Sequence, residues 1–115
     1  MEDCIFCKIA KGEIPSKKIL ETDNFFAVKD INPKVKGHSL IISKRHYPTL
    51  LDMPSSLLGE FLDAAKRLAF KLLDEEKAEG FNVVINSYEV AGQVVPHVHL
   101  HILPRKKDDG FRMRV

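Results

Sequence analysis

The sequence lacks the features that mark several specialised classes of protein. No apolar run approaches the roughly 18 residues that a membrane-spanning helix needs. A secretory signal carries positive charge near its start, where this chain has Glu2 and Asp3. Cysteine is scarce, and in a reducing cytoplasm Cys4 and Cys7 are not expected to form a structural disulfide. We therefore expect a cytoplasmic protein with no membrane partner.

A strong excess of one charge sign is also missing. Lys and Arg number 18 against 16 Asp and Glu, and the small excess gathers mainly in a basic tail, residues 105–115. No long basic stripe is present, so nucleic acid is not the expected partner. No repeat, low-complexity segment or linker divides the chain, which is 44% hydrophobic and 30% charged. We expect one domain over residues 1–115, small enough for pairing with a second copy to add stability.

Patterns of apolar and β-favouring residues predict five strands. Residues 17–30 are expected to form a hairpin around an Asp-Asn turn, because this pair tolerates tight-turn backbone angles. Residues 39–43 predict a third, buried strand after a segment that contains Asn, Pro and Gly. The last two strands are expected at 81–86 and 97–103. The loop between them is too long for a tight hairpin, and such loops are often functional.

Residues 54–77 have the spacing of an amphipathic helix. Leu, Phe and Ala recur every three or four residues, and charged residues occupy the opposite face. Pro54 suits the first helical turn, where its missing N–H is not needed. Gly80 is expected to end the helix.

Three of the five histidines occupy alternate positions in "VVPHVHLHIL", residues 94–103. On a strand, His97, His99 and His101 share one face, and the apolar residues between them are expected to pack against the helix. A solvated face on an edge strand is the alternative interpretation. However, aligned imidazoles repel one another when protonated, and Lys or Thr would solvate a strand without that penalty. The triple therefore indicates a site for anion or metal chemistry.

Two chemistries remain open for this face. A three-histidine metal site with an open position is a known hydrolytic arrangement, although no Asp or Glu lies between Gln93 and Lys107 to assist it. Alternatively, a neutral imidazole attacks phosphorus and forms a nucleotidyl-histidine, with a backbone carbonyl on the other ring nitrogen fixing the tautomer. Gly92 favours this second chemistry, since a glycine loop beside the triple lets backbone amides approach phosphate oxygens. By itself, "AGQ" is more typical of an ordinary turn, and only its position beside the triple reverses that preference.

Cys4 and Cys7 form a C-x-x-C pair, which is half of a tetrahedral zinc site. Two more ligands would be required, and histidines are the available candidates. A thioredoxin-like motif is disfavoured, because that motif lies between a strand and a helix and almost nothing precedes Cys4 here. Two thiols with no metal are the remaining alternative.

The segment "HVHLHIL" resembles the His-φ-His-φ-His-φ-φ pattern, with φ apolar, of the histidine triad (HIT) family of nucleotide hydrolases and transferases. The resemblance extends to "CIFCKIAKGEIPSKKI", "DINPKVKGHSLIISKRHY" and "VINSYEVAGQVVPHVHLHILPR", and covers most of residues 4–105. It implies an α+β fold with a five-stranded antiparallel sheet, one long helix and a short N-terminal helix. It also implies a homodimer with one continuous ten-stranded sheet, and a purine nucleotide or nucleotide conjugate as substrate.

The resemblance implies a catalytic set of four histidines. His99 would be the nucleophile that attacks the α-phosphorus of a nucleotide, and His97 would flank it. His101 would hydrogen-bond a phosphate or leaving-group oxygen. His38 would support the triad from behind it.

The resemblance also implies a nucleotide-binding set. Asp30 would bind the ribose hydroxyls, although a cap for the turn at "DINP" is the alternative. Apolar residues would wall the base pocket, although Phe6 and Ile31 could instead belong to the core. Polar loop residues would line the phosphates, although Asn86 could instead only satisfy loop backbone. The implied residues are Ile5, Phe6, Asp30, Ile31, Asn86, Gly92, Gln93, Val94, His99 and His101.

Val94 departs from the family pattern, because some relatives that cleave nucleoside phosphoramidates have serine there. Valine offers no hydroxyl to the leaving group, whose protonation would then depend on His97, His101 or bound water. The choice between phosphoramidates and dinucleoside polyphosphates stays open. Zinc-bearing relatives imply a structural site formed by Cys4, Cys7, His46 and His97, which requires the third and fifth strands to be neighbours.

The sequence is therefore consistent with three functions. The first is a nucleotide hydrolase or nucleotidyl transferase that acts through a covalent intermediate on His99. The second is a metal-dependent hydrolase that uses the histidine cluster as an open site. The third is a nucleotide-binding regulator without turnover.

Overall fold

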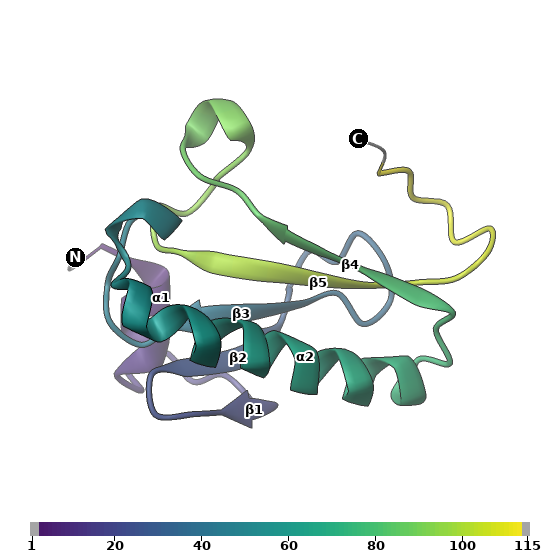
Figure 1. Ribbon diagram of the computed structural model, residues 1–115, viewed down its shortest axis with the longest axis horizontal. Coiled ribbons are helices and arrows are strands. Elements are labelled where there is room, and N and C mark those ends of the chain that lie inside the picture. The colour runs from purple at the N-terminus through teal and green to yellow at the C-terminus, as the bar shows by residue number, and fades with distance from the viewer. Residues whose placement is uncertain (1–2, 114–115) are drawn as a thin grey trace.

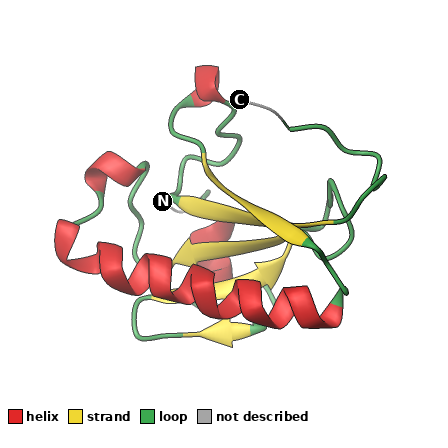
Figure 2. Cartoon of the chain, turned by 45° about the vertical axis from the view of Figure 1, so that its right-hand side comes forward, coloured by secondary structure: helices red, strands yellow, loops and turns green. Residues whose placement is uncertain are grey.

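An antiparallel sheet with helices on both faces organises the chain, and the computed structural model describes residues 3–113 (Figures 1 and 2). The predicted α+β class, the five strands, the long helix and the short N-terminal helix are all confirmed. The sheet order is β1-β2-β3-β5-β4. The strands are β1 (Leu20–Glu21), β2 (Phe25–Lys29), β3 (Ser39–Ser43), β4 (Gly80–Ile85) and β5 (His99–Arg105), and the helices are α1 (Ile5–Ala10) and α2 (Leu58–Glu75).

The larger core lies between α2 and one face of the sheet. Val98, Leu100 and Ile102 point into it, as predicted for the apolar residues between the histidines, and α2 contributes Phe61 and Leu68. These side chains are all at most 1% exposed. Complete burial of an aliphatic or aromatic side chain contributes about 1.5–3 kcal/mol. The α2 face is therefore the main source of stability.

The opposite face of the sheet carries the histidines and a smaller core formed with α1. In the β3–β5 pairing, Leu40 lies opposite His101 and Ile42 lies opposite His99. Since cross-strand partners share a face, the histidines stand beside the apolar cluster that α1 covers. β5 is an inner strand between β3 and β4, so the edge-strand interpretation of the triple is wrong.

Two predicted helix boundaries are corrected. Pro54 does not lie in the first turn of α2; it precedes a 3-10 turn, Ser55–Leu57, and the α-helix follows from Leu58. Gly80 does not end the helix, since it is the first residue of β4. Instead the chain leaves the helix at Lys77, whose φ of 53° is left-handed. Within residues 3–113, no helix combines the length and apolar character needed to cross a bilayer.

The fifth strand begins two residues later than predicted, at His99. The amide of Val98 donates to the carbonyl of Tyr47 at 2.6 Å, and the amide of His97 donates to the carbonyl of Val95 at 2.8 Å. These two amides therefore bond to loops and not to the sheet ladder. Residue 97 is held by side-chain contacts, which the strand pattern does not reveal.

Glu60, near the start of α2, holds the turn between β1 and β2. Its carboxylate accepts hydrogen bonds from the Thr22 hydroxyl at 2.6 Å and from the Asn24 amide and side chain, each at 2.8 Å. The bond from Thr22, followed by those from Asn24, lowers the pKa of Glu60.

Glu60→Ala should lower the free energy of unfolding by about 2 kcal/mol, because it removes charge-assisted bonds from the turn. The difference from wild type should shrink as the pH falls below 4.5, the ordinary value for this carboxyl. A lowered folded-state pKa gives stability that is present above the unfolded-state pKa and lost on acidification. Denaturant titrations at neutral pH and at about pH 3.5 measure both effects.

Glu75→Ala is the matched control on the exposed side of the same helix, where Glu75 forms an ion pair with the exposed Lys71 at 3.4 Å. It should change stability by less than about 0.5 kcal/mol. Equal losses in the two variants would contradict the assigned role of Glu60.

Candidate active site and metal centre

A cavity of about 680 Å³ opens on the face of the sheet that carries the histidines. Sites for small molecules typically have volumes of about 300–1,000 Å³. His38 lines this cavity, together with all but one of the predicted nucleotide-binding residues. Those that line it are Ile5, Phe6, Asp30, Ile31, Asn86, Gly92, Val94, His99 and His101.

Gln93 is the exception, because its side chain serves the loop between β4 and β5. It is 7% exposed, its amide group donates to the carbonyl of Pro48 at 2.6 Å, and its oxygen accepts from the amide of Tyr88 at 2.7 Å. Tyr88 has a φ of 73° and Gly92 a φ of 97°, both in the left-handed region. The Gln93 side chain therefore holds a strained loop, and it does not line the cavity.

The base-pocket residues differ in burial. Phe6 is 8% exposed and packs in the α1 core, so the core alternative holds for it even though its ring also lines the cavity. Ile31 is 87% exposed and Ile5 is 43% exposed, and neither belongs to the core. An exposed isoleucine at a cavity mouth offers an apolar surface to a flat ligand.

The tautomer of His99 follows from one hydrogen bond. Its Nδ1 lies 2.7 Å from the carbonyl oxygen of His97. A carbonyl oxygen only accepts, so Nδ1 carries the proton and Nε2 keeps a free lone pair. Burial lowers the pKa of His99, which favours the neutral ring. This is the arrangement that a nucleophilic imidazole requires.

A second chain of bonds sets the tautomer of His101. The backbone amide of Lys34 donates to Nδ1 of His38 at 3.1 Å, which places the proton of a neutral His38 on Nε2. That Nε2 lies 3.0 Å from Nδ1 of His101, which accepts the bond. The remaining proton of neutral His101 is therefore on Nε2. Burial, together with His99 and His38, lowers the pKa of His101 to about 4.

Asp30 combines its two predicted roles. Oδ1 accepts from the backbone amide of Asn32 at 2.8 Å, which is the turn-capping bond, and Oδ2 lies 3.4 Å from Nε2 of His38. Its side chain is 19% exposed and lines the cavity. The carboxylate can thus cap the turn and still face a ligand.

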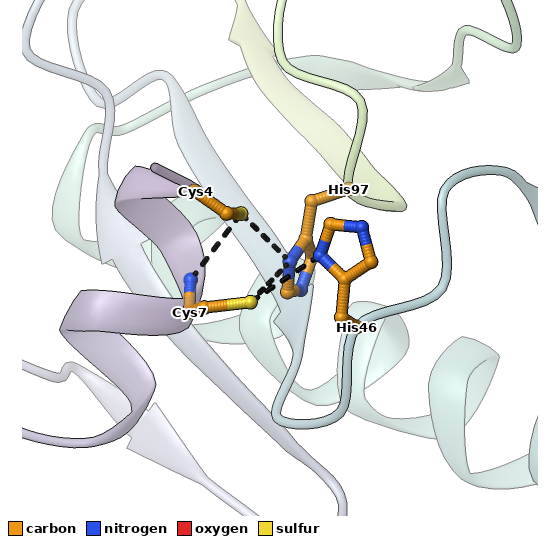
Figure 3. A group of neighbouring side chains, drawn as sticks. All are labelled: Cys4, Cys7, His46 and His97. Atoms are coloured by element: carbon orange, nitrogen blue, oxygen red, sulfur yellow. Dashed lines mark hydrogen bonds between the residues drawn. The ribbon is translucent and has the colours of Figure 1, made fainter. Parts of the chain in front are cut away.

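A second cluster lies at the start of α1, where Cys4, Cys7, His46 and His97 come together (Figure 3). The Nδ1 atom of His97 lies 3.2 Å from the Cys4 sulfur and 3.5 Å from the Cys7 sulfur, and Nδ1 of His46 lies 3.3 Å from the Cys7 sulfur. One ligand atom from each residue lies within 4.8 Å of all the others. β3 and β5 are neighbours, as the predicted participation of His46 requires.

The donor set of this cluster fits a zinc ion. Nε2 of His97 donates to the carbonyl of Ser43 at 2.7 Å, so the lone pair on Nδ1 faces the sulfurs. Burial lowers the pKa of His97 to about 4, which keeps the ring neutral. Neighbouring sulfur and nitrogen ligands of a tetrahedral zinc ion lie about 3.5 Å apart. The side chains therefore stand close to the positions that zinc would impose.

Comparison with known proteins identifies the family. The sequence model of the HIT domain family matches residues 11–108. The chain belongs to the HIT domain family. It is 45% identical over 109 residues to adenosine 5'-monophosphoramidase HNT1 of Candida albicans, which covers 91% of this chain and 72% of that protein. It is 41% identical over 107 residues to adenylylsulfatase HINT3 of Arabidopsis thaliana, but spans only 54% of that protein.

A solved HIT structure carries zinc. The crystal structure of a zinc-bound histidine triad family protein from Mycobacterium smegmatis superposes with a TM-score of 0.91 at 35% sequence identity, covering 98% of this chain and 82% of that one. The fold of this HIT chain is therefore that of its relatives.

Several residues that shape the site were not predicted. Lys34 and Ser43 act through a backbone amide and a backbone carbonyl, which side-chain patterns do not encode. Phe111 and Met113, from the segment predicted as a basic tail, line the cavity. Their apolar character among the charges of that tail was the available signal. Residues 114 and 115 of the predicted tail lie outside the described part of the chain.

Proposed function

We propose that this HIT protein cleaves nucleotide conjugates at the α-phosphate through a covalent nucleotidyl-His99. The substrate class is nucleoside phosphoramidates or dinucleoside polyphosphates. The observation that carries the proposal is the bond between Nδ1 of His99 and the carbonyl of His97, because it leaves the Nε2 lone pair free in a nucleotide-sized cavity. The names of its relatives support an adenosine nucleotide as the first substrate to test.

The cavity residues divide the reaction between them. Ile5, Phe6 and Ile31 would hold the base, and Asp30 would bind the ribose. Nε2 of His99 attacks the α-phosphorus, the phosphorus–nitrogen bond forms, and the bond to the leaving group breaks. Nε2–H of His101 would hold a bound water that gives its proton to the leaving group and becomes hydroxide, because a neutral His101 that lost its only proton would become an imidazolate anion.

In the second half, this hydroxide attacks the same phosphorus and the bond to His99 breaks. The electron pair of that bond returns to Nε2 of His99, so the ring regains its neutral starting form, His101 stays neutral throughout, and the mononucleotide is released. Asn86 and the backbone at Gly92 would hold the phosphate oxygens. Both line the cavity, and the glycine lets the chain come close to a ligand.

Val94 lines the cavity and is 89% exposed, with no group that donates a proton. Val94→Ser should raise kcat/KM for adenosine 5'-phosphoramidate by about 2–10-fold, the effect of one added hydrogen bond. Val90→Ser is the matched control, because Val90 is 99% exposed in the same loop and does not line the cavity. Steady-state rates of AMP release measure the difference. Equal effects of the two changes would contradict a leaving-group contact at position 94.

The experiment that tests the function is a substrate panel. Adenosine 5'-phosphoramidate, adenylyl sulfate and a dinucleoside polyphosphate are incubated with the zinc-loaded protein, and AMP release is followed by chromatography. We expect release from at least one of them. Tight AMP binding without product from any of them would favour a regulator without turnover.

A metal-dependent hydrolase has one observation in its favour. Asp30, His38 and His101 lie within 4.8 Å of one another and supply the acid that the local sequence lacks. However, the Lys34 amide occupies Nδ1 of His38, so a metal on Nε2 would require an imidazole with no proton at all. We therefore favour the covalent route. Brief chelation that abolishes turnover in a Cys4→Ser variant would reverse this preference.

We further propose that Cys4, Cys7, His46 and His97 hold a structural zinc ion. Four protein ligands leave no open position, so the ion would supply stability and no reaction step. It would tie the N-terminal helix to the residue that precedes β5. The fit of the donor set and the zinc-bound relative support this proposal.

We propose that two copies pair along β4, an edge strand of the sheet. Phe81 is 46% and Val83 is 42% exposed on its α2 side, and Phe70 of α2 is 66% exposed. An open apolar edge favours strand pairing. Val83→Lys should convert a dimer into a monomer in light scattering, whereas Val90→Lys, in the loop, should not. A wild-type monomer at high concentration would refute the pairing.

A further inference from the structure

His97 connects the metal centre to the nucleophile. Its ring is wholly buried, with Nδ1 facing the sulfurs of Cys4 and Cys7 and Nε2 bonded to the carbonyl of Ser43. The backbone carbonyl of His97 accepts a hydrogen bond from Nδ1–H of His99 at 2.7 Å. One residue thus contacts the proposed zinc site with its side chain and the proposed catalytic ring with its backbone.

The position of that carbonyl depends on how the ring is held. The amide of His97 bonds to the loop carbonyl of Val95, and β5 begins only at His99. Residue 97 therefore lacks the sheet ladder that fixes the carbonyls within β5. Its ring is anchored by Ser43 on one side and by the two cysteines on the other.

The tautomer of His99 follows from the position of this carbonyl. If the carbonyl moves out of reach, Nδ1 of His99 loses its acceptor, and the ring can place its proton on Nε2. In that tautomer the lone pair is on Nδ1, buried against the backbone. A ring in this state cannot attack phosphorus in the cavity.

We propose that His97 is a positioning residue through which metal occupancy at Cys4, Cys7 and His46 sets the tautomer of His99. The effect on turnover rests on the proposed covalent function, whereas the effect on the tautomer does not. The connection through His97 acts on the ring of His99 and not on the residues that would hold the base and the ribose. Loss of the metal should therefore lower kcat by about tenfold, while KM changes by less than about twofold.

The tautomer is measured directly by NMR. Protein with 15N-labelled histidine is compared in the zinc-loaded and chelated states without substrate, at one pH where the rings are neutral. Couplings between ring carbon-bound protons and ring nitrogens identify which nitrogen of His99 carries the proton. We expect Nδ1–H to dominate in the loaded protein and to lose population to Nε2–H on chelation.

Two variants separate positioning from general loss of stability. Glu60→Ala loosens the fold at a distant turn and should keep both the tautomer and kcat. His46→Ala retains both cysteines and His97 but binds zinc more weakly, so its Nδ1–H population and kcat should rise together as zinc is added. This titration covers the case in which the chelated wild type unfolds.

The outcomes are distinct for the two proposals. An unchanged Nδ1–H population in folded, metal-free protein, or in His46→Ala at every zinc concentration, would overturn the positioning role. A tautomer that shifts with zinc in a protein that turns over no substrate would retain the positioning role and remove the proposed function.

Discussion

His99→Ala should abolish AMP release, with kcat/KM for adenosine 5'-phosphoramidate falling by at least about 10⁴-fold. The change removes the group proposed to attack phosphorus, and the bond to the carbonyl of His97 keeps the Nε2 lone pair of this ring free. The fold should remain, because the packed face of β5 is formed by Leu100 and Ile102. Quenched time-point assays measure AMP release, and circular dichroism of the same preparation measures whether the fold is retained.

His101→Gln is the matched comparison. It removes the Nε2–H group that would hold the proton-donating water, and not the nucleophile, so turnover should fall by about 10²–10⁴-fold for amine leaving groups. The loss should be much smaller for a leaving group that departs without a proton. His99→Ala should remain inactive toward both kinds of substrate. Turnover by His99→Ala above one-hundredth of the wild-type rate would eliminate the covalent mechanism.

Cys4→Ser should have the largest effect on stability. When the free zinc concentration is about a thousand times the dissociation constant, zinc binding adds about 4 kcal/mol to the free energy of unfolding, and the variant loses this contribution. For a domain of this size, that corresponds to a fall in Tm on the order of 15 °C. Affinity for AMP should change far less, because the thiol does not line the cavity. Calorimetry, zinc analysis and AMP titration of one sample compare these quantities.

The control for this prediction is reversibility. Zinc added back after chelation should restore the Tm of the wild type and not that of Cys4→Ser, and Cys7→Ser should behave as Cys4→Ser does. The thermal control is Ser55→Ala, a serine change on an exposed 3-10 turn far from the cysteines in sequence. An unchanged Tm in Cys4→Ser, with no zinc in purified wild type, would refute the site.

The sequence was sufficient to predict the sheet, the long helix and the face on which the histidines lie. Alternation places His99 and His101 on one side of a strand whatever the rest of the fold, and Leu100 and Ile102 on the other. The Cys-x-x-C pair likewise predicted a cluster, because two sulfurs on one turn need few partners to complete a tetrahedron. Both patterns depend only on the backbone geometry of a few consecutive residues, so the rest of the fold does not change them.

The remaining features depend on contacts between distant segments. The strand pattern extends to His97, but Tyr47 and Val95 take the bonds that a sheet would make there. Gln93 resembles a ligand-binding side chain, but Pro48 and Tyr88 use its amide. Both tautomers are set by backbone groups, whose partners a sequence does not specify. Asp30 was predicted to bind ribose, but its position beside His38 was not predicted, since Asp30 follows a different strand.

The most direct test of the covalent mechanism is mass spectrometry of protein quenched during turnover of a slow adenosine conjugate. Zinc-loaded wild type should gain the mass of one adenylyl group, and peptide mapping should place it on His99. His101→Gln should accumulate the same adduct if its hydrolysis is slowed, and His99→Ala should show none. Steady turnover with no adduct at any quench time, or an adduct on another residue, would contradict nucleophilic attack by His99.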